Sequence, residues 1–224
     1  ANNEQRFSSF TKYIKENNYK KIYGIYDPGN ITYTKDYLEN FEKSFILNGG
    51  EKFIKYGRTD ENLDDLVSQI NDSNPDLILI CANSIDSSRV VQYLKIKGVK
   101  TQIASSEWAM TPAFLENSGR YSEGIIFNID YDENSKSEDF LDFYTKYKEK
   151  YNIEPSLYAS KGYELARVII ELLKMGKQTE LKKNLLIKKE FKGLQDTIIF
   201  DQYGDVIRKF NTFKVVNGKF EIIE

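Results

Sequence analysis

Two apolar segments that each end in a short polar loop constrain the fold of this chain most strongly. Residues 76–82, DLILICA, form a continuous apolar run of the kind found in strands that are buried on both faces of a sheet. Residues 101–105, TQIAS, read as the next strand, and apolar residues at helical spacing lie between the two. This strand-helix-strand pattern predicts a parallel sheet, and in an open sheet of that kind the ligand crevice lies at the carboxyl ends of the strands.

The same alternation of strands and helices occurs earlier in the chain. Residues 21–26, KIYGIY, read as a strand, and Thr34 is a plausible N-cap of a helix that ends near Gly49. A further strand is expected at 53–56 and a helix at 63–70. Three right-handed β-α-β units of this kind predict a doubly wound α/β layer with a parallel sheet.

The organisation changes after Ser118. Residues 121–137 read as an extended crossing segment followed by a polar linker, which is a candidate hinge. Helices are expected within 138–190, and residues 191–224 alternate in the period-two manner of strands. Asn217-Gly218 is a strong two-residue hairpin signal, so we expect a closing antiparallel ribbon. We therefore divide the chain into a three-layer α/β domain at 1–120, a hinge, a helical part and a returning ribbon.

Composition excludes several classes of function. The formal charge is only −2 and no basic stripe is visible, so nucleic acid is not an expected partner. The chain has no His, no P-loop and no GxGxxG motif, and its one cysteine, Cys81, lies in an apolar run typical of a buried structural thiol. We expect no catalytic residues, no cofactor and no metal, although a site made of carboxylates alone stays open.

Five segments, taken in order, resemble the bacterial two-lobed periplasmic binding proteins for leucine, isoleucine and valine. They are YDPGNITYTKDYLENF, NPDLILICANS, KGVKTQIASSEW, PSLYASKGYELARVIIELL, and FKGLQDTIIFDQYGD with VVNGKF. The resemblance begins where the second lobe of such proteins begins. It implies a type I periplasmic-binding-protein fold with lobe two at 1–120, a hinge crossover at 121–137 and return helices of lobe one at 138–190. Residues 191–224 would then be the return crossover and the ribbon on lobe two, and the N-terminal part of lobe one would not be in this chain.

The resemblance also assigns two ligand contacts in lobe two. Tyr33 matches the tyrosine that faces the ligand from the first helix of that lobe, although it could also be an ordinary exposed tyrosine. Glu107 matches the acidic residue that holds the ammonium group of the ligand, and a carboxylate in a water-poor cleft forms a strong charge-assisted hydrogen bond to an amine. The alternative is a carboxylate stabilised by the dipole of the helix that follows Thr111.

Four further residues are candidate ligand contacts. Asn83 lies where branched-chain binders tend to carry an aromatic residue, and this departure leaves the ligand open. Ser106 and Trp108 flank Glu107, and the indole could line a pocket or simply pack on its own lobe. Tyr163 matches the tyrosine of a return helix that faces the cleft from lobe one, with a position in the core as the alternative.

The resemblance implies a non-catalytic protein that captures a small amine-bearing ligand, foremost an amino acid, and delivers it to the membrane permease of an ABC importer. The location would be the periplasm or, for a lipoprotein, the cell surface, with the address upstream of Ala1. One alternative is a ligand-sensing domain of a receptor or regulator with the same fold. Another is an unrelated α/β enzyme of hydrolase type. Apolar surface left by the absent part of lobe one could also drive dimerisation of the fragment.

Overall fold

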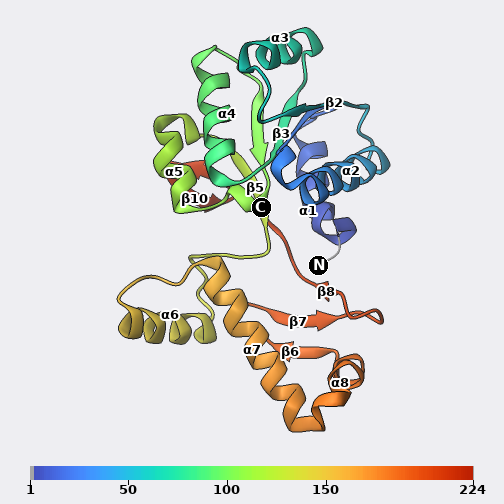
Figure 1. The fold of residues 1–224 in the computed structure, drawn as a ribbon, viewed down its shortest axis with the longest axis vertical. Helices are drawn as coiled ribbons and strands as arrows, with labels where there is room; N and C mark the ends of the chain where they lie inside the picture. The colour runs from blue at the N-terminus through green and yellow to red at the C-terminus, as the bar shows by residue number, and fades with distance from the viewer. Residues whose placement is uncertain (1–2, 224) are drawn as a thin grey trace. The chain divides into compact units, whose positions relative to one another are not determined.

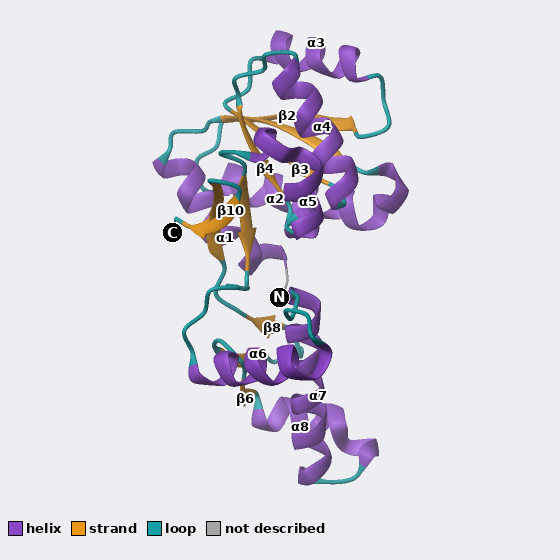
Figure 2. Ribbon diagram, turned by 90° about the vertical axis from the view of Figure 1, so that its left-hand side faces the viewer, coloured by secondary structure: helices purple, strands orange, loops and turns teal. Residues whose placement is uncertain are grey.

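The computed structural model describes residues 3–223 and divides the chain into two compact units (Figures 1 and 2). The sheet unit comprises Arg6–Ile129 and Phe210–Glu224, and the helical unit comprises Asp130–Lys209 with the residues that precede Arg6. Each unit has its own sheet. The chain enters the sheet unit at Arg6, leaves it after Ile129 and returns to it at Phe210.

A seven-stranded sheet organises the sheet unit. Its strand order is β10-β9-β5-β4-β3-β1-β2. Strands β1 to β5 are parallel to one another, whereas β9 pairs antiparallel with β5 and β10 pairs antiparallel with β9. The strands are β1 (Lys21–Tyr26), β2 (Lys52–Arg58), β3 (Leu77–Cys81), β4 (Gln102–Ser105), β5 (Ile126–Ile129), β9 (Asn211–Val216) and β10 (Lys219–Ile222). The α-helices are α1 (Asn3–Glu16), α2 (Ile31–Leu47), α3 (Leu63–Ser73), α4 (Ser84–Ile96) and α5 (Pro112–Ser118). The predicted α/β fold with a parallel sheet is confirmed.

Helices cover both faces of this sheet. On one face, apolar residues of α1 and α2 pack against alternate residues of the strands, among them Leu77, Leu79 and Cys81 of β3. The other residues of β3 face the opposite side, where Figure 1 shows α3, α4 and α5. All five residues of β3 are buried, which explains why its sequence is apolar throughout instead of alternating.

Side chains cap the starts of α3, α4 and α5, whereas α2 starts without a side-chain cap. The side chains of Asn62, Asn83 and Thr111 accept hydrogen bonds from the first turns of α3, α4 and α5. Thr34 was predicted to cap α2 but lies inside it, because the Pro28–Asn30 turn is a 3₁₀ helix that runs directly into the α-helix. The hydroxyl of Thr34 instead donates to the carbonyl oxygen of Asp27 at 2.7 Å, which ties the helix to the loop after β1.

Between Asp130 and Lys209 the helical unit contains three α-helices and a small antiparallel sheet. They are α6 (Glu138–Tyr151), α7 (Leu157–Met175), α8 (Leu181–Lys188), β6 (Glu190–Lys192), β7 (Thr197–Phe200) and β8 (Val206–Ile207). Val168 and Leu172 of α7 pack with Phe191 and Ile198 of the sheet. Other apolar side chains of α7, including those of Leu165 and Ile170, are exposed.

The strands expected within 191–224 are divided between the two sheets. β6, β7 and β8 belong to the helical unit, whereas β9 and β10 extend the large sheet beside β5. The hairpin signal holds, because Asn217 and Gly218 connect β9 to β10 with φ angles of 52° and 72°. Period-two alternation thus predicts strands correctly but does not indicate which sheet they join.

Candidate functional site

The strand order places a topological switch point between β1 and β3. The chain leaves β1 towards β2 on one side and continues from β3 to β4 on the other, so the loops after β1 and β3 diverge at the carboxyl edge of the sheet. Ligands of open α/β proteins bind at such an edge. The loops found there contain Asp27, Asn83 and Glu107, which follow β1, β3 and β4 respectively.

Glu107 has two close partners within the sheet unit. It opens a 3₁₀ turn, Glu107–Ala109, directly after β4 and Ser106. Its Oε1 accepts a hydrogen bond from the Tyr33 hydroxyl at 2.9 Å and lies 2.8 Å from Nη1 of Arg6. The α5 N-terminus is capped by Thr111 and not by Glu107. The carboxylate is therefore held by a phenol and a guanidinium, and the dipole of α5 is not needed to explain it.

Arg6 lies in aromatic surroundings. Its guanidinium carbon is 5.7 Å from the ring centroid of Tyr37 and 6.0 Å from that of Phe210. Burial by itself would lower the pKa of Arg6, but the charge of Glu107 and the neighbouring tyrosines raise it overall. Burial, reinforced by the charge of Glu107, raises the pKa of Tyr33 and that of Tyr37 well above the usual range. The two phenols beside Arg6 and Glu107 therefore stay neutral.

Several polar atoms of this cluster have spare hydrogen-bonding capacity. Among residues 3–223, no hydrogen-bond partner is found for Oε2 of Glu107, Nε of Arg6 or the hydroxyl of Tyr37. All three atoms are shielded from solvent. Buried polar groups are normally paired, so unpaired ones gathered at one place are typical of a functional site.

Asn83 has a local structural role at the same edge. Its Oδ1 accepts hydrogen bonds from the amides of Ile85 and Asp86 at 2.9 Å each, which caps α4. Its Nδ2 donates to Asp86 at 2.7 Å and to Asp27 Oδ2 at 3.4 Å. The side-chain amide is thus engaged in positioning the loops that follow β1 and β3.

The remaining predicted residues are placed differently. Trp108 contacts Tyr33 edge-to-face, with ring centroids 5.7 Å apart, and Ser106 is fully buried. Tyr163 belongs to α7 of the helical unit, where its ring lies 4.7 Å from that of Phe143. The structure therefore brings Tyr33, Glu107 and Trp108 into direct contact within one unit, with Ser106 adjacent in the chain.

Sequence reasoning did not identify Arg6, Tyr37 or Phe210 as members of this cluster. Tyr37 was predicted to belong to the apolar stripe of its helix, and its side chain is indeed buried, with an exposed fraction of 1%. Arg6 precedes the apolar stripe of α1 by one residue and has no sequence signal that separates it from an ordinary surface arginine. Its pairing with Glu107 spans 101 positions of the chain, and only the fold shows it.

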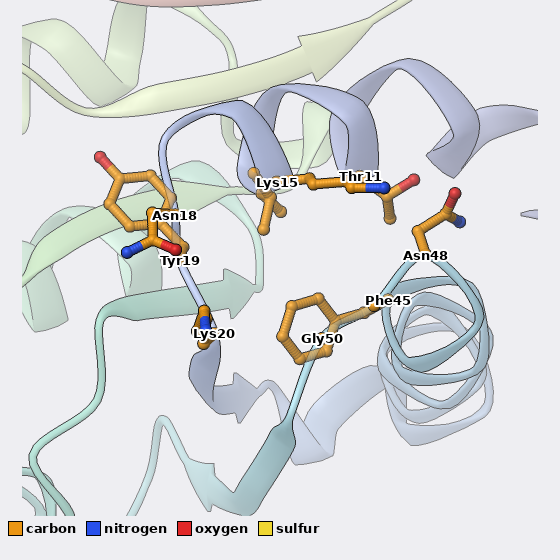
Figure 3. A pocket seen from close by; sticks show the side chains of 10 residues that line it. Thr11, Lys15, Asn18, Tyr19, Lys20, Phe45, Asn48 and Gly50 are labelled. Atoms are coloured by element: carbon orange, nitrogen blue, oxygen red, sulfur yellow. The ribbon is translucent and has the colours of Figure 1, made fainter.

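A separate cavity of about 290 Å³ lies at the opposite, amino-terminal edge of the sheet (Figure 3). It is lined by the end of α1, the segment leading into β1 and the end of α2, with Lys15, Tyr19 and Phe45 among its walls. None of the residues that line it belongs to the cluster around Glu107. Among the described residues, no set of three or more Cys, Asp or Glu is arranged to hold a metal ion, and no helix is both long and apolar enough to span a membrane.

Comparison with known proteins gives one family. A family model described as periplasmic binding protein matches residues 1–219. No curated protein matches the chain in a direct sequence comparison. The matched family is one of binding proteins, in line with the expectation of a non-catalytic chain.

Solved structures of this kind share the fold at low sequence identity. The leucine binding protein LivK from Thermotoga maritima MSB8 is 20% identical, with a TM-score of 0.88 over 99% of this chain and 65% of that one. LivJ from Streptococcus pneumoniae, a branched-chain amino acid transporter substrate-binding protein in complex with isoleucine, is 20% identical, with a TM-score of 0.81 over 99% and 65%. A solute-binding protein from R. palustris in complex with benzoate is 14% identical, with a TM-score of 0.81 over 99% and 62%. The chain therefore spans less than two thirds of the length of these structures.

Proposed function

Because this chain belongs to the periplasmic binding protein family, we propose that it is part of an extracytoplasmic solute-binding protein that serves an ABC importer. The proposed ligand is a small amine-bearing molecule, foremost an amino acid. The partner would be the membrane permease, and the location would be the periplasm or the cell surface. The observation that carries the ligand class is the carboxylate of Glu107 at the carboxyl edge of the sheet.

The geometry around Glu107 suits the recognition of an amine. One oxygen, Oε1, is fixed by the Tyr33 hydroxyl, so the carboxylate is oriented. The other oxygen, Oε2, has no partner among the described residues and is available to accept a charge-assisted hydrogen bond. Trp108 packs against the same tyrosine ring and would limit the access of water to the ligand. We propose Tyr33, Glu107 and Trp108 as the ligand contacts of the sheet unit.

The other candidates have supporting roles in this proposal. Asn83 shapes the edge, because it caps α4 and links to Asp27. Ser106 is buried and precedes the 3₁₀ turn that Glu107 opens. Tyr163 is part of the helical unit, and the proposal does not depend on it.

The similar structures favour a small organic solute but do not agree on an amine. LivK is named as a leucine binding protein and LivJ is in complex with isoleucine, and both ligands are amino acids. The R. palustris protein is in complex with benzoate, which has a carboxylate and no amine. An experiment on ligand class must therefore include an anion without an amine.

A thermal-shift and calorimetric screen of the complete protein tests the proposal. The ligands would be the common amino acids with benzoate as the amine-free comparison, and the variant would be Glu107→Gln. A ligand at about 100 times its dissociation constant adds roughly 2.7 kcal/mol to the free energy of unfolding. Loss of a charged hydrogen bond worth about 1.5–3 kcal/mol should weaken amine binding by roughly 10- to 150-fold in the variant.

Glu116→Gln is a matched control, because Glu116 is an exposed carboxylate on α5 of the same unit. It should leave affinity unchanged. Equal affinity of the wild-type protein and Glu107→Gln for an amino acid would refute the role of Glu107. Stabilisation by benzoate and by none of the amines would refute the proposed ligand class.

A further inference from the structure

The surroundings of Arg6 have the composition of a binding site for an organic cation. A carboxylate, Glu107, lies 2.8 Å from the guanidinium, and the rings of Tyr37 and Phe210 lie within 6.0 Å of it. A carboxylate combined with aromatic faces is the arrangement by which proteins recognise ammonium and guanidinium ligands. In this chain the cation in that position is one of its own side chains.

The Arg6–Glu107 pair is incompletely formed. Arginine and a carboxylate commonly make two parallel hydrogen bonds, which gives the pair its strength. Here Nη1 lies 2.8 Å from Oε1 without the geometry of a hydrogen bond, and Nε of Arg6 and Oε2 of Glu107 are buried without partners in the described part of the chain. Oε1 is moreover shared with the Tyr33 hydroxyl. A pair with unused donors and acceptors on both sides is easier to exchange than a bidentate one.

We propose that Arg6 is an internal competitor for the amine site: its guanidinium occupies the position on Glu107 that the amino group of a ligand takes, and binding displaces it. This inference rests on the proposed function, because it concerns the same carboxylate. Its basis is charge balance, since the single carboxylate of Glu107 can neutralise one cation and not two. To bind, a ligand must therefore interact with Glu107 more favourably than the guanidinium of Arg6 does.

The place of Arg6 in the chain gives the exchange a wider consequence. Arg6 is the residue at which the chain enters the sheet unit, and Phe210, whose ring it contacts, is the residue at which the chain returns. Release of the guanidinium would free both of these segments from a shared contact. Ligand binding would then be coupled to the two segments that connect the units.

Chemical rescue tests the cation site without knowledge of the natural ligand. Arg6→Ala removes the side chain beyond Cβ, and ethylguanidinium reproduces the part removed. At concentrations of a few times its dissociation constant, ethylguanidinium should raise the melting temperature of Arg6→Ala by about 2–4 °C. It should not do so for the wild-type protein or for Arg6→Ala combined with Glu107→Gln. Arg120→Ala is a matched control, because Arg120 is an exposed arginine of the same unit that pairs only with Tyr121 among the described residues.

Three related probes decide between displacement of Arg6 and direct recognition of a ligand by Arg6. They are L-leucine, 3-methylbutylamine, which lacks the carboxylate, and 4-methylpentanoate, which lacks the amine. Displacement predicts that Arg6→Gln binds the two amines at least tenfold more tightly than wild type, with no gain for the anion. Weaker binding of leucine and 4-methylpentanoate by Arg6→Gln would overturn the inference, since Arg6 would then hold the ligand's carboxylate.

The two proposals fail in distinguishable ways. Absence of rescue, or equal rescue when Glu107 is also replaced, overturns the internal competitor even if Glu107→Gln abolishes amino-acid binding. Rescue that depends on Glu107 supports the competitor even if the screen of natural ligands finds none. Before either comparison, far-ultraviolet circular dichroism verifies that the Arg6→Ala protein is folded.

Discussion

Glu164 of the helical unit holds a buried ionic network, and its replacement should destabilise that unit strongly. Its side chain, 6% exposed, pairs with Nη2 of Arg208 at 2.6 Å, and its Oε1 accepts the amide hydrogen of Leu194 at 2.8 Å. Arg208 also approaches Asp130 at 3.5 Å, and Asp130 in turn accepts a hydrogen bond from Lys161 at 2.8 Å. The network therefore joins α7 to the first and penultimate residues of the segment Asp130–Lys209.

Two replacements of Glu164 should lower the free energy of unfolding by different amounts. Glu164→Ala leaves the guanidinium of Arg208 buried with only the longer contact to Asp130, and removal of one partner of a buried pair costs about 3–5 kcal/mol. It also leaves the Leu194 amide without its acceptor. Glu164→Gln removes the charge but retains an oxygen for that amide, so the loss should be smaller, about 1.5–3 kcal/mol.

Urea denaturation followed by circular dichroism measures these free energies, and amide hydrogen exchange measures the protection of Leu194. Protection should fall in Glu164→Ala and persist in Glu164→Gln. Asp142→Asn is the control, because Asp142 forms an exposed pair with Lys146 one turn along α6 and its loss should leave stability unchanged. If Glu164→Ala lowers the free energy of unfolding by less than about 1 kcal/mol, and Leu194 keeps its protection, the network does not stabilise the unit as reasoned here.

Two further predictions concern a pair of glycines and a buried tyrosine. Gly193→Ala should destabilise the helical unit, because the added Cβ would come within 2.2 Å of the carbonyl oxygen of Asp196. Gly162 lies inside α7 with open space around it, so Gly162→Ala should raise the free energy of unfolding by about 0.5–1 kcal/mol. Thermal melts of the two variants give the comparison, and equal melting temperatures would contradict it. Burial raises the pKa of Tyr23 to about 12, so this phenol ionises at lower pH in the unfolded chain than in the folded one. Its contribution to the free energy of unfolding is therefore fully present below about pH 10 and should be lost as the pH rises towards 12. In Tyr23→Phe the urea midpoint should decline less steeply over that interval, and an unchanged slope would exclude this contribution.

The parts of the fold that the sequence predicts are those governed by local periodicity. Residues 76–82 could be recognised as a buried strand because a strand covered on both faces needs apolar side chains throughout. The Asn217-Gly218 hairpin was recognisable because its two positive φ angles demand such residues. In each case neighbours in the chain supply the constraint.

The parts that the sequence does not predict depend on which distant segments meet. The strands of 191–224 alternate in the same way whether they join the small sheet or the large one, so their division at Phe210 leaves no trace in the pattern. Glu107 and Tyr33 were identified through family resemblance, and the structure places them 2.9 Å apart. Arg6 escaped notice because its partner is set by the packing of α1 against the sheet, which no local signal encodes.

The contact between Trp108 and Tyr33 places a fluorescent side chain beside the cluster around Glu107. The chain has a single tryptophan, so its fluorescence carries no background from other indoles. The ring lies against the tyrosine whose hydroxyl donates to Glu107, and the charge near an indole shifts its emission. The proposed exchange of a cation on that carboxylate would thus be reported by one chromophore, and its rate would be measurable by stopped flow without any label.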